Sequence, residues 1–70
     1  MTEKILEKMP VRVRGQIEIY RKDYNEAKRY DKQWILNETM ARASAYCKGL
    51  MDAGLITDKE RQMLFIYTTV

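Results

Sequence analysis

Ser44 and Cys47 are the two side chains of this sequence that could serve as nucleophiles. Either one needs a base to take its proton, and the chain contains no histidine. Tyrosine and lysine can also act as acid or base, but none stands at a recognisable catalytic spacing from another group. The three glycines do not match a phosphate-binding loop, and a lone cysteine without histidine cannot build a zinc site. We therefore expect no catalysis, no metal, no cofactor and no small-molecule substrate.

Basic side chains are concentrated in one segment of the chain. Residues 10–32 carry seven of them against four acids, so the net charge of +3 lies entirely in this segment. Three of the basic residues recur every seven positions beside a potential helix face, and two continue toward the following turn. These residues are Arg14, Arg21, Lys28, Arg29 and Lys32. Such a stripe could track phosphates while Tyr30 or Trp34 stacks on bases, although the interspersed acids also fit a solvated, salt-bridged face.

Protein binding is the function that the apolar residues favour. Five methionines, five tyrosines, one tryptophan and one phenylalanine are many adaptable or anchoring side chains for 70 residues. The sequence MLFIY, residues 63–67, would cover most of the circumference of a last helix expected over about 58–67, so one face cannot bury it. We expect the surplus to meet another element, another subunit or a partner. The expected interface residues are Tyr30, Trp34, Met63, Phe65, Ile66 and Tyr67.

Helices are the elements most strongly indicated in the first half of the chain. Residues 2–9 could form a short helix with Thr2 as N-cap, and Pro10 fits the first turn of another helix. From Val11 the segment VRVRGQIEI alternates apolar and polar residues, as a small β-hairpin does. A longer apolar series recurs at helical spacing, and an isolated β-hairpin is barely stable, so we favour a helix over roughly 11–29. The members of this series are Val13, Ile17, Tyr20, Tyr24 and Ala27.

The next predicted helix begins after Asp31, a plausible N-cap. It carries an apolar seam at spacings of four, three, four and three residues, which is one face of a helix. The seam is formed by Leu36, Met40, Ala43, Cys47 and Leu50.

A tight corner is predicted at residues 54–57. Gly54 can adopt the left-handed conformation that often ends a helix. Thr57 and Glu60 match a capping box at the start of the next helix, and Leu55 and Ile56 are expected to anchor the corner in the core. Every residue of this corner has a structural role, so we assign no function to it.

The chain is predicted to form a single all-α domain over residues 1–70, a small bundle of three to four helices. Its core is marginal at this length, which favours self-association. No apolar run approaches the ~20 residues needed to cross a membrane, and the first ten residues lack the apolar stretch of a signal peptide. We therefore expect a cytoplasmic protein in which Cys47 is reduced and buried.

Residues 50–64, LMDAGLITDKERQML, resemble the core of SHOCT (short C-terminal) domains, in which a GLIT-type corner joins two helices. That resemblance implies a role in association. In size, charge and lack of motifs the chain is similar to small accessory proteins of bacterial phages and mobile elements, some of which inhibit host defence nucleases by occluding a surface.

The sequence thus predicts a non-catalytic helical adaptor or inhibitor that self-associates or docks on a larger protein. The alternative is a nucleic-acid-binding accessory protein that uses the basic stripe.

Overall fold

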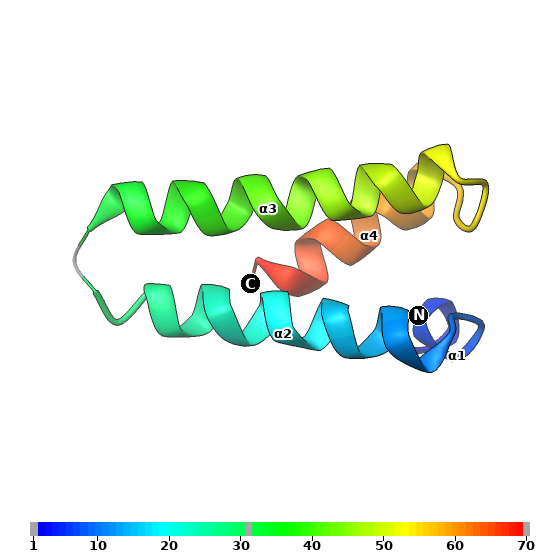
Figure 1. The fold of residues 1–70 in the computed structure, drawn as a ribbon, viewed down its shortest axis with the longest axis horizontal. Coiled ribbons are helices and arrows are strands. Elements are labelled where there is room, and N and C mark those ends of the chain that lie inside the picture. Colours follow the sequence, from blue (N-terminus) through cyan, green and yellow to red (C-terminus); the bar gives the residue numbers. More distant parts are fainter. Residues whose placement is uncertain (1, 31, 70) are drawn as a thin grey trace.

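The computed structural model describes residues 2–30 and 32–69, which form four helices and no strand. Helices α2 (Val11–Ala27) and α3 (Gln33–Asp52) lie antiparallel as a helical hairpin (Figure 1). Helix α4 (Asp58–Thr68) crosses behind this hairpin and ends between its two helices, and the short α1 (Thr2–Glu7) packs against α4. The predicted all-α bundle is therefore confirmed, and residues 11–19 are helical rather than a β-hairpin.

Pro10 sets the boundary between the first two helices. It occupies the N-cap position of α2, with φ −57° and ψ 150°, because its ring fixes φ and its nitrogen has no hydrogen to donate. It also disfavours helical conformation at Met9, so α1 ends at Glu7 rather than continuing to residue 9. The expected N-cap, Thr2, is already the first residue of α1.

The turn between α2 and α3 differs from the expected boundaries by a few residues. Helix α2 ends at Ala27 rather than near residue 29, and α3 begins at Gln33. Lys32 occupies the N-cap position of α3 in an extended conformation, and no side chain caps the helix there. The expected cap, Asp31, lies outside the described residues.

The corner between α3 and α4 is built as its sequence predicts. Gly54 has φ 79°, and the Gly54 and Leu55 amides donate to the Met51 and Leu50 carbonyls, which is the hydrogen-bond pattern of a Schellman motif. Thr57 Oγ1 accepts from the Glu60 amide at 3.1 Å, and Glu60 Oε1 accepts from the Thr57 amide at 2.9 Å. This capping box satisfies two amides that the helix itself cannot.

One expectation at this corner is wrong. Ile56 is buried as predicted, but Leu55 is 46% exposed. Leu55 directly follows the left-handed glycine, where the chain reverses direction, so only one of the two apolar residues can face the core.

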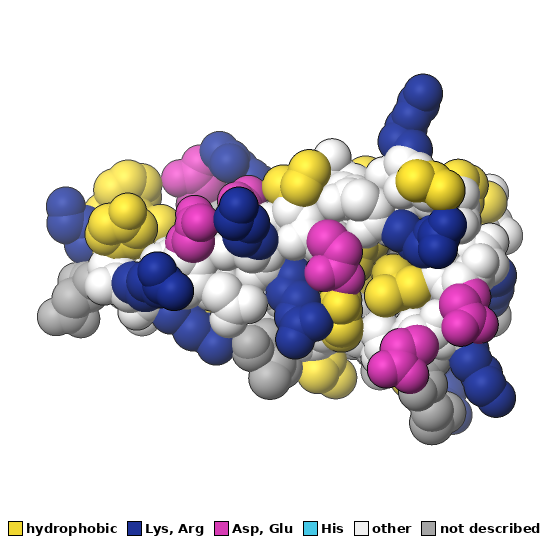
Figure 2. Space-filling model, turned by 90° about the horizontal axis from the view of Figure 1, so that it is seen from below, with side chains coloured by type: hydrophobic (Ala, Val, Ile, Leu, Met, Phe, Trp, Pro, Cys, Tyr) yellow, Lys and Arg dark blue, Asp and Glu magenta, His cyan; other side chains and the backbone are white. Residues whose placement is uncertain are grey.

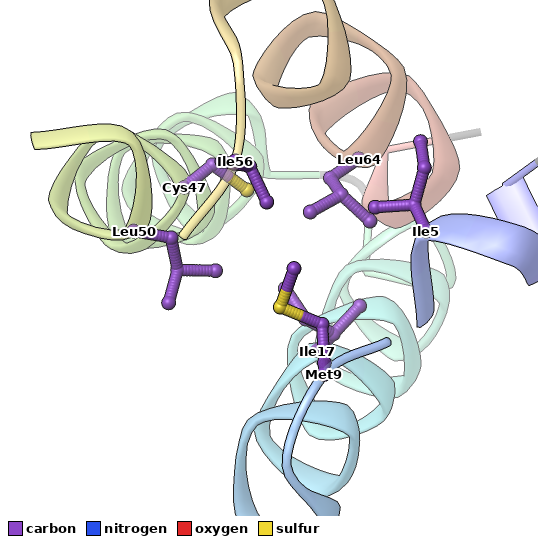
Figure 3. Packing of buried hydrophobic residues seen from close by; sticks show 7 residues of the cluster. All are labelled: Ile5, Met9, Ile17, Cys47, Leu50, Ile56 and Leu64. Atoms are coloured by element: carbon purple, nitrogen blue, oxygen red, sulfur yellow. The ribbon is translucent and has the colours of Figure 1, made fainter. Parts of the chain in front are cut away.

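The core lies where α4 crosses the helical hairpin. Ile17 from α2 and Leu64 from α4 are fully buried at its centre, and Figure 3 shows the neighbouring side chains converging on them. All four helices or their connecting segments contribute to this cluster, so no pair of helices forms a core alone. Its buried members are Ile5, Met9, Ile17, Cys47, Leu50, Ile56 and Leu64.

An ion pair fastens the segment after α1 to the start of α4. Lys8 Nζ lies 2.5 Å from Glu60 Oε2, the same carboxylate that completes the capping box. The hydrogen bond from Lys8, followed by the one from the Thr57 amide, lowers the pKa of Glu60 below its ordinary value of 4.5. Both contacts therefore favour the ionised form of the carboxylate.

Replacing two glycines should change stability in opposite directions. Gly54→Ala is expected to destabilise the fold by about 1 kcal/mol, because alanine is strained at positive φ. Gly15→Ala, in the exposed interior of α2 where an added Cβ meets nothing within 4 Å, should instead stabilise it by up to about 1 kcal/mol. Urea unfolding followed by far-UV circular dichroism measures both, and equal signs for the two variants would contradict this account of the corner.

Acid should weaken the Lys8–Glu60 link. Since the folded pKa of Glu60 is lowered, its contribution is present above the unfolded pKa of about 4.5 and is lost as pH falls through the lower folded value. Lys8→Gln should therefore lower the urea midpoint at pH 7, and the difference from wild type should shrink as the pH falls below about 4.5 and the carboxyl becomes protonated. Lys4→Gln, an exposed site on α1, is the control. An unchanged midpoint at pH 7 would show that the ion pair does not contribute.

Candidate interaction site

The apolar run of α4 is largely accommodated within the chain. Leu64 is fully buried and Ile66 is 58% exposed, while Met63, Phe65 and Tyr67 are partly buried. Helix α4 packs against α1, α2 and α3, so it has neighbours on several sides rather than on one face. Of the exposed apolar surface that the sequence led us to expect on α4, mainly the side chain of Ile66 remains.

Tyr67 is held by two side chains of α2. Its hydroxyl donates a hydrogen bond to the Glu18 carboxylate, and the Arg21 guanidinium carbon lies 4.3 Å from the centroid of its ring. The hydrogen bond to Glu18 is the main cause that raises the pKa of Tyr67, and burial adds to it. Sequence reasoning assigned Tyr67 and Arg21 to two competing surfaces, whereas the structure brings them together.

The two other aromatic candidates lie at the hairpin tip, which we define as residues 28–30 and 32–35. Tyr30 is 60% exposed and Trp34 is 63% exposed. At 100° per residue, Trp34 lies about 180° around α3 from Ala43, which is buried. Because α4 ends before it reaches this region, the tip is only two helices thick (Figure 1). Neither aromatic side chain is needed to fill the core.

The predicted basic stripe does not form a continuous positive surface. Arg21 is engaged by Tyr67, and Lys28 Nζ lies 5.1 Å from the centroid of the Tyr24 ring. Figure 2, which looks onto the molecule from the side of α2, shows basic and acidic side chains interleaved. Arg14 is exposed in the first turn of α2, at the opposite end of this helix from Arg29 and Lys32. Only Lys28, Arg29 and Lys32 share the tip with the exposed aromatics.

A groove of about 330 Å³ runs between α2 and α3 and reaches the tip. Tyr20 packs against Tyr46 beside it, with ring centroids 5.4 Å apart. Arg42 on the α3 wall pairs with Glu38, at 2.6 Å. The groove, called the α2–α3 groove below, is lined by Tyr20, Asp23, Glu26, Ala27, Tyr30, Ile35, Thr39 and Arg42. No pattern in the sequence indicated it, because its walls come from two separate helices.

The candidate nucleophiles do not form a reactive site. Cys47 is 1% exposed, and burial raises the pKa of its thiol, whereas Ser44 lies on the exposed side of α3. A buried thiol with a raised pKa is a poor nucleophile because the reactive form is the thiolate. Within residues 2–30 and 32–69, no three side chains with metal-binding groups lie together.

Comparison with known proteins adds no relative: no family model, curated protein or solved structure matches the chain significantly. Across the described helices, none has the combination of length and apolar character required to traverse a lipid bilayer. The hairpin tip, with two exposed aromatics and three basic residues, is thus the candidate site on geometry alone.

Cys47 should react slowly with an aromatic disulfide reagent in the native protein. Modification requires local opening of the core, so we expect a rate at least about a hundredfold below that of a thiol introduced by Ala45→Cys on the exposed side of α3. Absorbance of the released aromatic thiolate measures both rates, and denaturant should make them equal. Fast labelling of native Cys47 would contradict its burial.

Proposed function

We propose that this chain is a non-catalytic interaction protein that docks on a larger protein through the hairpin tip. The observation that carries the proposal is the exposure of Tyr30 and Trp34 at one end of a helical hairpin. Docking of this kind suits an adaptor, or an inhibitor that occludes a surface of its target.

The exposed aromatics provide the binding energy in this proposal. Large aromatic side chains dominate many protein interfaces, because each buries a wide apolar area with few rotatable bonds. Tyr30 lies in the connection between α2 and α3, and Trp34 lies in the first turn of α3, so both are held by two helices that pack against each other. Ile66, on the outer side of α4, offers a smaller apolar surface that lies on a different helix.

The charge around the tip indicates the kind of partner. Lys28, Arg29 and Lys32 are all exposed there. A partner surface with an apolar recess surrounded by acidic side chains would complement them, and the charges would speed association more than they strengthen it.

The decisive experiment compares capture by the immobilised full chain and its variants. Trp34→Ser and Tyr30→Ser are each expected to weaken partner binding by about 2 kcal/mol, roughly 30-fold in affinity, because both remove a central anchor. Val11→Ser removes a side chain that is 74% exposed at the other end of α2, and it should leave binding intact. Quantitative mass spectrometry of the captured proteins measures the difference. Equal capture by all three variants would refute docking at the tip.

A second function, binding of single-stranded nucleic acid, is supported by the same convergence of aromatic and basic side chains at the tip. Fluorescence anisotropy with a labelled oligothymidine distinguishes this alternative from protein docking.

If the tip binds single-stranded nucleic acid, the affinity for the oligothymidine should fall steeply with added salt. It should also fall in the triple variant Lys28→Glu, Arg29→Glu and Lys32→Glu. Binding to protein depends mainly on the aromatics, so it should change little with salt.

A further inference from the structure

The α2–α3 groove lies on a side of the helical hairpin that α4 does not cover. Arg21 marks the covered side of α2, since its guanidinium lies over Tyr67 of α4. Asp23, on the groove wall, is two residues further along and therefore roughly 160° around the helix from Arg21. Helix α1 packs against α4, so it too lies away from this wall. The groove side of the hairpin is therefore open to another molecule.

The two walls of the groove carry opposite charges. Asp23 and Glu26 stand on the α2 wall, and Arg42 stands on the α3 wall. Within residues 2–30 and 32–69, neither acid has a basic group within 4.0 Å, and Arg42 pairs with its neighbour Glu38 instead. All three side chains are exposed, so each could reach a partner across the groove.

We propose that this side of the hairpin binds a second copy of the chain, forming a two-fold dimer in which two helical hairpins pack face to face. A two-fold interface uses the same surface twice, so that surface must complement itself. An acidic wall beside a basic wall meets this requirement, whereas a groove with a single charge would repel its own copy. The proposal goes beyond docking at the tip, because it requires only this chain.

The charges also select the orientation of the dimer. A two-fold axis parallel to the long axis of the hairpins places α2 of one copy over α3 of the other, so Asp23 and Glu26 face the partner's Arg42. An axis across the hairpins would place α2 over α2, and the acids of the two copies would then repel each other. The first arrangement sets the two hairpin tips at the same end. Trp34, which points away from the core, stays accessible there, whereas Tyr30, which also lines the groove, would lie at the edge of the dimer contact.

Apolar side chains supply the attraction that these exposed charges cannot. Ion pairs at an exposed rim contribute little to affinity, so they mainly set orientation. Tyr20, Ala27 and Ile35 are apolar side chains that line the groove. Ile19 is 52% exposed and precedes Asp23 by one turn of α2, so it adds apolar surface next to the groove. A stable interface buries about 800 Å² on each partner. That area is roughly a sixth of the 4962 Å² surface of this chain. The contact can extend along the helical hairpin, because the molecule is 35 Å long in this direction.

A charge-swap experiment on the full chain tests the dimer. Sedimentation equilibrium should show a dimer for the wild type and a monomer for Arg42→Glu and for Asp23→Arg with Glu26→Arg, each with a dissociation constant raised at least about tenfold. An equimolar mixture of the two variants should form a dimer again, because both contacts become attractive. Lys48→Glu, with the same charge change on the outer side of α3, is the control that should remain dimeric.

Two isoleucines distinguish this surface from α4. Ile19→Ser should weaken the dimer, whereas Ile66→Ser, at a site 58% exposed on the outer side of α4, should not. Dissociation by Ile66→Ser alone would place the contact on α4 and overturn the proposal. A wild-type monomer at high micromolar concentration, or a failure of the mixed variants to associate, would also overturn it, while leaving docking through Trp34 intact. Far-UV circular dichroism checks that every variant remains folded.

Discussion

The length of α4 constrains the rest of this structure. Its 11 residues span about 16 Å, whereas the 20 residues of α3 span about 30 Å, so α4 can cover only about half of the helical hairpin. Ile17 and Leu64 are fully buried within the covered half. Beyond the end of α4 the two long helices have only each other, and large side chains there cannot all be enclosed. The packed core therefore lies at the base, whereas two large aromatic side chains, Tyr30 and Trp34, are exposed at the tip.

The fold followed from the sequence wherever its determinants are close together along the chain. Gly54 and the Thr57–Glu60 box define the last corner through hydrogen bonds that span at most five residues. The helical spacing from Val13 to Ala27 likewise outweighed the shorter alternating pattern, because it placed Ile17 in the core. The end of α2 was less predictable: it lies at Ala27, about two residues before the expected boundary, where helical spacing alone marks no stop.

The surfaces could not be predicted in the same way, because they depend on how the helices cross. The run from Met63 to Tyr67 indicated an apolar circumference, but not that three helices surround it. The contacts of Tyr67 with Glu18 and Arg21 join residues more than 40 positions apart, and no local pattern marks them. The exposure expected for Tyr30 and Trp34 is observed, since Tyr30 lies in the connection between the helices and Trp34 in the first turn of α3. Their role in binding remains a proposal.

The separation of base and tip bears on what the tip residues do. Trp34 is the second residue of α3 and is 63% exposed, so the core gains little from it. A glutamate or lysine at that position would have a higher helix propensity and would keep the surface better hydrated. The packing of the hairpin thus gives no physical reason for a tryptophan there. Because Ile17, Cys47 and Leu64 maintain the fold at a distance from the tip, an interface can be placed at Trp34 without a cost in stability.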